Sequence, residues 1–400
     1  MITKNNIPPG YKDSAVGIIP QEWEVATLGK LVSITSGESP SLFNLRDVGK
    51  YPYIKVEDMN NCEKYQADSR EYTDDERVVI AKGSIIFPKR GAAITNNKVR
   101  IAACQLYMDS NMMAITPNDL VCGDYLYFKI TYEQLFRIAD TSTIPQINNK
   151  HIIPYKICLP PLAEQRKIAE ILGVWDEAIE KQSQLIEKLE LRKRALMQHL
   201  LTGRTRLPGF TAPWQKVKLG EIFKERNETK CEHLPLLSIT ADRGVILQSE
   251  SDKKDTSNDD KSKYKRICPN DIGYNTMRMW QGRSALSAIE GIVSPAYTIV
   301  TPKVEVDPLF ISELIKQPRV VYDFWTHSQG LVGDTLNCKF HDFSQVKVAI
   351  PSLSEQKAIA EVLTTADDEI ATHRKKLDVL RLQKRGLMQQ LLTGKTRVKI

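Results

Sequence analysis

The sequence predicts an α+β protein in which two mixed α/β domains are separated by a pair of long antiparallel coiled-coil helices, arranged as a pseudo-twofold repeat. Residues 164–206 recur at 355–397 without a gap, and 21 of the 43 aligned positions are identical. Inside both copies, apolar residues are spaced alternately four and three apart, which is the pattern of a coiled-coil seam. A globular segment precedes each copy, so the repeat decides the architecture of the chain.

The predicted seam is interrupted at the same two places in both copies. Gln182 corresponds to His373, and Lys193 corresponds to Lys384. Polar seam residues weaken packing but fix the register of paired helices. The alternative is two solvated helices with ordinary surface charge, which the matched seam disfavours. The apolar seam positions are Ile168, Leu172, Trp175, Ile179, Leu189, Leu196, Ile359, Leu363, Ile370, Leu377, Leu380 and Leu387.

Local signals mark the ends of both helices. A Pro-Pro pair at 160–161 precedes the first helix, and Ser352 with Glu355 has the spacing of a capping box at the second. Gly203 and Gly394 stand where a left-handed C-cap residue would end each helix.

Charge sets the predicted direction of pairing. The first half of each helical stretch is rich in Asp and Glu, and the second half is rich in Lys and Arg. Acid therefore lies beside base only if the helices pair antiparallel. A domain roughly 35–40 Å across can turn the chain round at one end of a rod of about 60 Å, but it cannot easily span the rod. Both arguments place the domains at opposite ends and return the C-terminus to the first domain.

A chain of 400 residues is too long for one hydrophobic core. The repeat divides it into a first domain at 1–158, a first spacer helix at 159–206, a second domain at 207–349 and a second spacer helix at 350–400. Short β-type runs followed by one helix predict a mixed α/β structure for each domain. The predicted strands are 78–80, 84–87, 99–104, 244–248, 271–274 and 296–300; the helices are 125–139 and 308–315; and 250–263 is a polar loop.

Composition excludes several classes of protein. No apolar run reaches membrane-spanning length, and residues 1–10 lack the apolar core of a signal peptide, so no membrane partner is expected. The seven cysteines are scattered without a Cys-x-x-Cys pair, which favours a reduced cytoplasm over a disulfide framework or a zinc site. A net charge of +7 permits nucleic-acid binding without establishing it.

No catalytic constellation stands out in the sequence. The run Gly-Lys-Thr at 394–396 lacks the first glycine of a P-loop, because Gln389 occupies that place. Residues 355–357 imitate a nuclease Glu-x-Lys motif, but they open a helix whose twin begins Glu-Gln-Arg. The six histidines show no metal-ligand spacing. We therefore predict no catalytic residue, metal or cofactor in this chain.

Two loops carry the residue types that read DNA. Each follows a β-type run and mixes Arg or Lys with Asn, Gln and Gly. Arg pairs bidentately with guanine, Asn or Gln with adenine, and Lys binds phosphates. A solvated basic loop is the alternative, but the equivalent placement in both halves favours binding. The predicted DNA-binding residues are Lys89, Arg90, Asn96, Asn97, Lys98, Asn275, Arg278, Trp280, Gln281 and Arg283.

With these features, the chain resembles the specificity subunit of a type I restriction–modification system over essentially all 400 residues. The resemblance rests on Leu-Pro-Pro-Leu-Ala-Glu-Gln at 159–165, on the twin Leu-Leu-Thr-Gly ends, and on two variable domains joined by repeated helices. Thr-Ile-Pro-Gln-Ile-Asn at 143–148 resembles the close of a target recognition domain in that family. The second domain departs from this pattern, with Gly-Asp-Thr-Leu-Asn at 333–337.

The resemblance implies that each domain reads one half of a split, asymmetric site in double-stranded DNA. The helices would hold the halves apart as a ruler. Their outward faces, for example at Glu180 and Glu187, would dock two methyltransferase subunits, which carry S-adenosylmethionine and usually methylate adenine N6. Two motor-nuclease subunits with ATP and Mg²⁺ would join for cleavage. This chain itself would be non-catalytic and hold no cofactor.

Three rival functions remain open at this point. The chain could be a stand-alone DNA-binding or architectural protein with a coiled-coil spacer, an unrecognised enzyme, or a coiled-coil scaffold without a nucleic-acid partner. Co-purification with methyltransferase subunits, activity of the isolated chain, and a salt-dependent DNA shift separate them. The target bases and spacer length depend on loop conformation rather than on composition.

Overall fold

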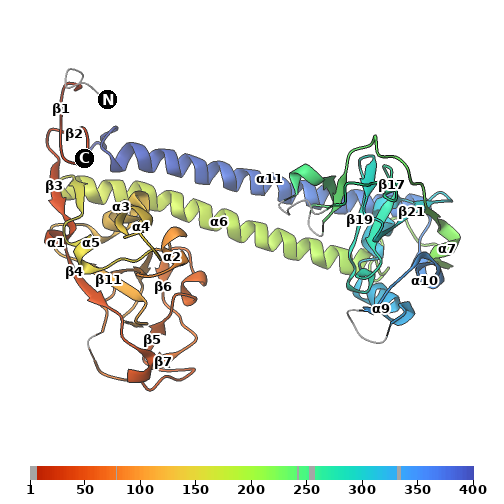
Figure 1. Ribbon diagram of the computed structural model, residues 1–400, viewed down its shortest axis with the longest axis horizontal. Coiled ribbons are helices and arrows are strands. Elements are labelled where there is room, and N and C mark those ends of the chain that lie inside the picture. The colour runs from red at the N-terminus through yellow and green to blue at the C-terminus, as the bar shows by residue number, and fades with distance from the viewer. Residues whose placement is uncertain (1–6, 78, 241–242, 252–256, 331–334) are drawn as a thin grey trace. The chain divides into compact units, whose positions relative to one another are not determined.

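The computed structural model describes residues 7–77, 79–240, 243–251, 257–330 and 335–400. These residues belong to two compact units. Unit 1 comprises residues 1–183 and 376–400, and unit 2 comprises residues 184–375. Each unit holds one mixed α/β domain together with one end of each long helix (Figure 1).

The two long helices coincide with the repeated stretches of sequence. α6 is Leu162–Leu200 and α11 is Leu353–Leu392. Gly203 and Gly394, just beyond their ends, have φ angles of +68° and +73°. Glycine adopts this left-handed conformation without strain. The predicted C-caps are therefore confirmed.

The predicted capping box at the start of α11 is only half formed. Ser352 Oγ accepts a hydrogen bond from the backbone N–H of Glu355 at 3.4 Å. The Glu355 carboxylate does not return to Ser352, because it binds Arg206 at 2.6 Å through both oxygens. An ion pair has replaced the second bond of the box.

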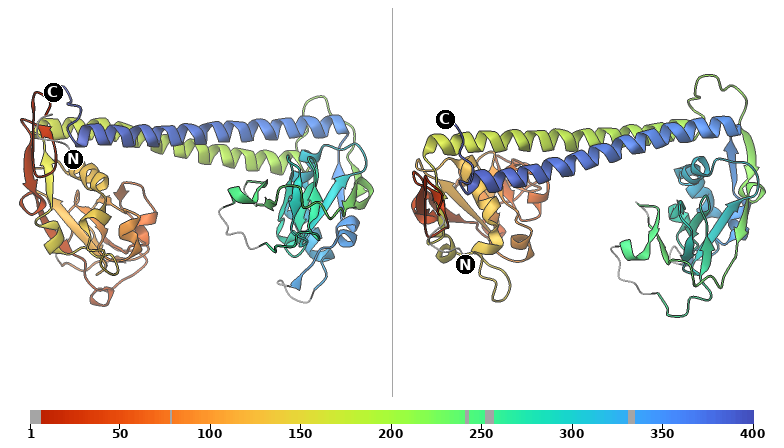
Figure 2. Two further views of the ribbon diagram at one scale, coloured as in Figure 1. Left: turned by 45° about the horizontal axis from the view of Figure 1, so that its top comes forward. Right: turned by 90° about the horizontal axis from the view of Figure 1, so that it is seen from above.

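The long helices pair antiparallel in both units. In unit 1 the beginning of α6 lies beside the end of α11, and in unit 2 the end of α6 lies beside the beginning of α11 (Figures 1 and 2). Lys384 forms an ion pair with Asp176 in unit 1, and Lys193 pairs with Asp367 at 2.6 Å in unit 2. These are the two lysines that interrupt the seam, so the charge of each is neutralised by the facing helix.

All predicted seam residues, from Ile168 to Leu387, are buried or half-buried. Gln182, at one polar interruption, is 6% exposed, and His373 at its counterpart is half-buried. Burial of one stripe on each helix is what a coiled-coil seam requires.

The domain of unit 1 is built on a five-stranded sheet with strand order β4-β11-β8-β9-β6. The neighbours are antiparallel except for β9 and β6, which are parallel. Ile85 and Phe87 of β8 pack in one buried cluster with α3, while Ile86 packs in another. Alternate strand residues face opposite sides, so both faces of the sheet are covered. The elements are β1 (Tyr11–Lys12), β2 (Ile19–Pro20), β3 (Glu24–Thr27), α1 (Leu28–Leu31), β4 (Val32–Ser36), η1 (Pro40–Leu42), β6 (Tyr65–Gln66), β8 (Ile85–Pro88), α2 (Ala92–Thr95), β9 (Arg100–Ala102), β11 (Met112–Pro117), α3 (Gly123–Glu133), α4 (Leu135–Ile138), α5 (Asn149–Ile152) and β12 (Lys156–Leu159).

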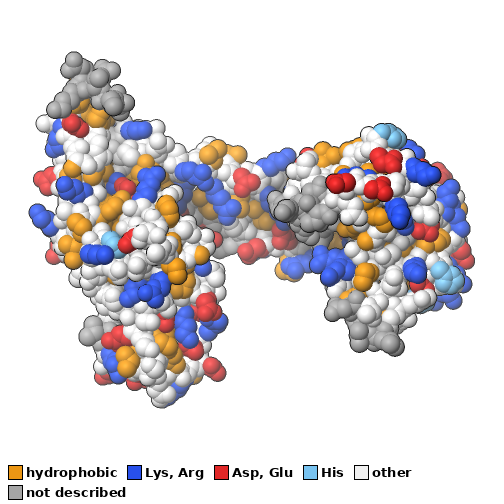
Figure 3. Space-filling model, in the orientation of Figure 1, with side chains coloured by type: hydrophobic (Ala, Val, Ile, Leu, Met, Phe, Trp, Pro, Cys, Tyr) orange, Lys and Arg blue, Asp and Glu red, His pale blue; other side chains and the backbone are white. Residues whose placement is uncertain are grey.

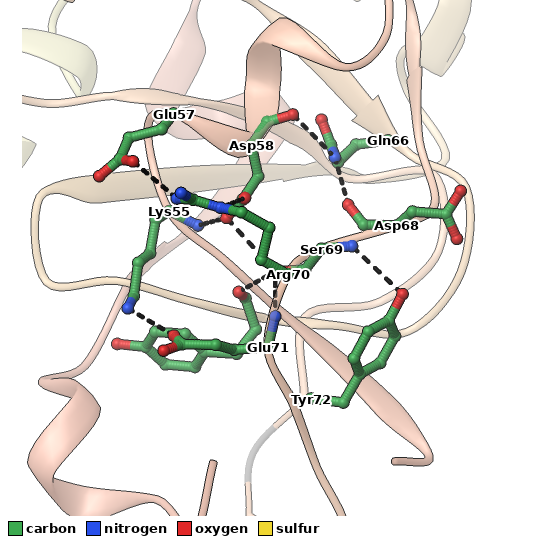
Figure 4. Close-up of polar contacts among 10 residues, drawn as sticks. Lys55, Glu57, Asp58, Gln66, Asp68, Ser69, Arg70, Glu71 and Tyr72 are labelled. Carbon is green, nitrogen blue, oxygen red and sulfur yellow. Dashed lines mark hydrogen bonds and ion pairs between the residues drawn. The ribbon is translucent and has the colours of Figure 1, made fainter. Parts of the chain in front are cut away.

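An outer lobe covers the second face of this sheet. It consists of β5 (Tyr51–Ile54), η2 (Asp58–Asn60), β7 (Tyr72–Thr73) and β10 (Tyr107–Met108). A polar network ties it together around Asp58, which is 1% exposed (Figure 4). Its carboxylate accepts hydrogen bonds from the Lys55 backbone N–H at 2.8 Å, Arg70 Nε at 2.9 Å and Ser69 Oγ at 3.3 Å. A buried carboxylate satisfied in this way stabilises the lobe.

The domain of unit 2 repeats the central part of that sheet, with strand order β14-β21-β18-β19 against β4-β11-β8-β9 in unit 1. The divergent domain sequences therefore share one scaffold. The elements are β13 (Gln215–Lys218), α7 (Leu219–Ile222), β14 (Phe223–Arg226), β15 (Leu237–Ile239), β16 (Val245–Leu247), η3 (Gln248–Glu250), β17 (Lys265–Ile267), β18 (Ile272–Asn275), η4 (Met279–Gln281), β19 (Ser284–Leu286), β20 (Gly291–Val293), β21 (Tyr297–Pro302), α8 (Pro308–Leu314), α9 (Pro318–His327), α10 (Phe340–Gln345) and β22 (Lys347–Ile350).

A two-stranded ladder joins each domain to its long helix. β3 pairs with β12 in unit 1, and β13 pairs with β22 in unit 2, with the same register 191 residues later. The Leu-Gly dipeptide after β3 also recurs after β13. A Cβ on Gly29 or on Gly220 would lie 3.0 Å from the backbone oxygen of Ile153 or of Ser344, respectively. The repeated glycine is thus required by a close backbone approach.

Three local predictions need correction. The helix expected at 125–139 is divided into α3 and α4, because Gln134 takes a φ of +66°. Of the strand expected at 78–80, residue 78 lies outside the described residues, Val79 is not in a strand, and Ile80 forms only an isolated bridge with Leu106. The loop at 250–263 begins within η3, and residues 252–256 lie outside the described residues. The other predicted elements correspond to β8, β9, β16, β18, β21 and α8.

Candidate nucleic-acid interface

The two predicted DNA-binding loops occupy equivalent places in the repeated sheet. The loop of unit 1 joins β8 to β9, and the loop of unit 2 joins β18 to β19. Both pairs of strands are antiparallel neighbours at the same position in the strand order. The same scaffold therefore presents two loops of different sequence.

The unit 1 loop presents some predicted residues and uses others internally. Arg90 and Asn96 are exposed, and Lys89 is half-buried. Lys98 Nζ donates to Asn60 Oδ1 at 2.6 Å. Asn97 has a φ of +49°, and its side chain binds α3 and α4.

Both polar atoms of the Asn97 side chain are engaged within the domain. Nδ2 donates to the Thr131 carbonyl at 2.9 Å, and Oδ1 accepts from the Leu135 backbone N–H at 2.9 Å. The amide thus caps the start of α4. We place Asn97 among the residues that shape the loop and exclude it from the proposed base-reading set.

The indole of Trp280 stabilises the conformation of the unit 2 loop. Trp280 is half-buried, and its Nε1 donates to the Met277 carbonyl at 2.9 Å. Asn275 Oδ1 accepts the Met277 N–H at 3.0 Å, which tightens the same turn. Gly282 has a φ of +72°, a conformation that favours glycine. Three predicted residues remain exposed on this loop: Arg278, Gln281 and Arg283.

The segment that resembles the close of a recognition domain lies against the loop of unit 1. The Gly91 N–H donates to the Pro145 carbonyl, and the Ile147 N–H donates to the Lys89 carbonyl, each at 2.9 Å. Ile144, directly before these contacts, is 65% exposed. The sequence motif at 143–148 was recognised, but its position beside the loop was missed.

The same contact recurs in unit 2 despite the departure in sequence. The Cys338 N–H donates to the Thr276 carbonyl at 2.8 Å, at the place corresponding to Ile147 and Lys89. Residues 333 and 334 of the departing segment lie outside the described residues. Burial raises the pKa of the Cys338 thiol to about 12, so the thiol is neutral at physiological pH.

A cleft of about 780 Å³ lies beside the unit 2 loop. Four of the predicted DNA-binding residues line it, namely Asn275, Arg278, Gln281 and Arg283. Sequence analysis missed Arg243 and Lys316, which also line the cleft. Their signal in the sequence is weak, because each is an isolated cation far from the loop along the chain.

Basic residues alone do not delineate an interface on this protein. Lys and Arg side chains are interspersed with acidic ones on the face shown in Figure 3. Among the described residues, no hydrogen bond or ion pair occupies the guanidinium of Arg278 or Arg283. A cleft lined by one sign of charge concentrates oppositely charged ligands, and the Arg-lined cleft has the charge that an anion-binding surface requires.

The predicted partner contacts lie on exposed helix surface. Glu180 and Glu187 are both exposed on α6. No group of three or more His, Cys, Asp or Glu residues that could hold a metal ion occurs in the described part of the chain. No helix in that part is long and apolar enough to cross a membrane.

Comparisons with known proteins place these features in one family. The sequence matches the type I restriction modification DNA specificity domain over residues 20–191 and 309–382. It is 24% identical over 425 aligned residues to the type I restriction enzyme MjaVIII specificity subunit of Methanocaldococcus jannaschii, covering 95% of this chain and 94% of that one.

Two solved structures share the fold. The S subunit of a type I restriction–modification system from M. genitalium has a TM-score of 0.56 at 16% identity, covering 98% of each chain. A structure from a study of complex assembly and conformational transition of the type I R-M system has a TM-score of 0.61 at 16% identity, covering 94% of this chain and 99% of that one. The predicted fold class is confirmed, and the chain belongs to the type I restriction modification DNA specificity family.

Proposed function

We propose that this chain is the DNA-specificity subunit of a type I restriction–modification complex, in which it reads a bipartite, asymmetric site and docks methyltransferase subunits. The observation that carries this proposal is the pair of equivalent loops after β8 and β18. Two sheets of matching strand order each present a different set of Arg, Lys, Asn and Gln. Two different half-sites are what such a pair would recognise.

The side chains of the two loops suit different parts of the DNA. Arg90 in unit 1 and Arg278 in unit 2 suit guanine edges, while Lys89 suits phosphates. This chain contributes recognition without catalysis. The methyltransferase subunits carry S-adenosylmethionine, and the motor-nuclease subunits use ATP and Mg²⁺. We propose two copies of each and a cytoplasmic complex.

The paired helices act as the ruler between half-sites in this proposal. Inserting four residues after Gln182 and four after His373 adds about one turn, or roughly 6 Å, to each helix. Base pairs are stacked about 3.4 Å apart along the duplex. The spacer between half-sites should change by one or two base pairs, while both half-site sequences stay the same.

The test is a methylome of cells that carry this chain with its methyltransferase. A bipartite methylated motif is expected, and it should be absent without this chain. An active lengthened variant with the original spacer would contradict the ruler. DNA binding without methyltransferase association would favour a stand-alone DNA-binding protein.

A further inference from the structure

The cleft of unit 2 is assembled from three separate parts of the domain. One wall is the loop between β18 and β19. The second is formed by the end of β15 with Thr240 and Arg243, and the third includes Lys316 between α8 and α9. The lining residues are Ser238, Ile239, Thr240, Arg243, Ser251, Asn275, Arg278, Gln281, Gly282, Arg283, Ser284, Tyr297 and Lys316.

Charge defines the ligand that this cleft suits. Four lining residues are Arg or Lys, and none of the described lining residues is Asp or Glu. Lys316 Nζ is paired with Glu313 at 2.8 Å, and Arg243 donates to the Glu250 carbonyl at 3.1 Å. These bonds hold the two cations beside the cleft. Glu313 offsets part of the charge of Lys316, so an anion in the cleft would experience mainly the field of the arginines.

The walls differ in the chemistry they offer. The β18–β19 loop combines Arg278 and Arg283 with Gln281, side chains that pair bidentately with base edges. The other walls combine Lys316 and Arg243 with the hydroxyl groups of Ser238, Thr240 and Tyr297. Hydroxyls and point charges are typical of phosphate contacts.

We propose that this cleft holds the phosphate backbone of the half-site read by unit 2, with Arg243 and Lys316 as phosphate-binding residues. The backbone held there sets the register in which Arg278 and Arg283 meet the bases. This inference rests on the proposed function and extends the interface from one loop to three segments.

The experiment measures binding of the full chain, in complex with its methyltransferase subunits, to its cognate duplex and to a scrambled duplex across a salt series. Arg243→Ala and Lys316→Ala should each weaken both complexes to a similar degree. Each should also reduce the slope of log affinity against log salt by about 0.9. The methylated sequence should stay unchanged.

Two controls make the result specific. Lys316→Arg should restore the slope, because it keeps the charge. Lys347→Ala, which removes an exposed cation on β22 away from the cleft lining, should leave the slope intact. Arg278→Ala should instead relax one base of the half-site.

The cleft assignment would be overturned if Arg243→Ala and Lys316→Ala both left the affinity and the salt slope unchanged. If the parent complex still preferred its cognate duplex, the proposed function would stand. A changed methylated sequence would make Arg243 or Lys316 a base reader and would also overturn the cleft assignment. A parent complex without sequence preference would instead refute the proposed function.

Discussion

The ends of the long helices are anchored differently in the two units. In unit 1, the buried Glu164 carboxylate binds Arg397 at 2.7 and 2.9 Å and also accepts a bond from Trp23 Nε1 at 2.9 Å. In unit 2, Glu355 binds Arg206, but the corresponding buried Trp214 Nε1 has no partner among the described residues. The same three residue types therefore form a complete triad in unit 1 and an incomplete one in unit 2.

A buried lysine adds a second anchor in unit 1. Lys129 is 2% exposed; it donates to the Leu392 carbonyl at 3.1 Å and forms an ion pair with Glu133 at 2.9 Å. Burial lowers its pKa, but the neighbouring Cys158 and Glu133 outweigh that effect, and the net pKa is raised. Lys129 therefore keeps its charge at neutral pH.

The corresponding positions in unit 2 are apolar. The backbone N–H of Cys122, just before α3, donates to Gln165 Oε1. The backbone N–H of Asp307, just before α8, makes the equivalent bond to Gln356 Oε1. Aligning the two helices on these bonds places Leu314 at the position of Lys129. In the matched ladders, Ala349 of β22 occupies the place of Cys158 in β12. Unit 2 therefore lacks the polar anchor of unit 1.

The two anchors also differ in chain connectivity. The end of α6 continues directly into β13 of its own unit, whereas Leu392 at the end of α11 meets Lys129, 263 positions earlier. Closing a longer loop costs more conformational entropy. The stronger set of polar contacts thus holds the helix end that closes the longer loop.

The largest expected contrast comes from replacing the matched tryptophans. Trp23→Phe should destabilise unit 1 by about 3 kcal/mol, because it creates a cavity and removes a donor from a buried carboxylate. Trp214→Phe should cost about 1 kcal/mol, since no such bond is lost. Hydrogen exchange of the last turns of α11 and α6 reports the two effects. Equal losses of protection would refute the unequal anchoring.

The buried lysine provides the second contrast. Lys129→Met should cost about 2 kcal/mol, because Glu133 and the Leu392 carbonyl lose a buried donor. Leu314→Met is the matched control and should cost less than about 1.5 kcal/mol. Both are measured by urea unfolding.

The pH dependence of Lys129→Met separates charge from packing. A raised pKa means that the folded state favours the charged lysine, so this stabilisation is fully present below the unfolded pKa of about 10.4. The difference in unfolding free energy between the parent chain and Lys129→Met should therefore narrow as the pH rises through the folded-state pKa of Lys129. A gap that stays constant there would indicate packing alone.

The two candidate DNA-binding loops should affect different half-sites, although the sheets that carry them share one strand order. Arg278→Ala should cost about 1–3 kcal/mol in DNA binding and relax one base in one half-site. Arg90→Ala should relax the other half-site. Methylome sequencing checks both variants, and full stringency in both half-sites would contradict the loop assignment.

The adjacent residues Asn96 and Asn97 of the unit 1 loop should differ in their contribution to stability. Asn97→Ala should lower stability by about 1 kcal/mol, because it removes the cap of α4. Asn96→Ala should leave stability unchanged, since its side chain is exposed. Thermal unfolding tests both; equal destabilisation would show that the cap is unimportant.

The smallest effect is expected on the helix surface. Reversing Glu180 and Glu187 to Lys should weaken methyltransferase association by up to about 1 kcal/mol per exposed contact, while half-site preference persists. Glu232→Lys, at an exposed site in the unit 2 domain, serves as the control. Unchanged co-purification would place the partner interface elsewhere.

The sequence by itself determined the helices, their ends and their direction. Periodic apolar residues and C-terminal glycines are local patterns, and each operates within a few residues. The antiparallel direction also followed from the sequence, because charge changes sign along each helix. Seam positions such as Leu172 and Leu363 could therefore be chosen before any contact was known.

Only the tertiary structure decided how distant segments combine at the candidate site. It engaged Asn97 inside the domain, laid residues 143–148 beside the unit 1 loop and brought Arg243 and Lys316 to the unit 2 cleft. The physical reason is that these contacts depend on which strands and turns meet across long stretches of chain. Local periodicity in the sequence does not encode these long-range contacts. The residue types of the candidate interface could therefore be predicted, but which segments come together there could not.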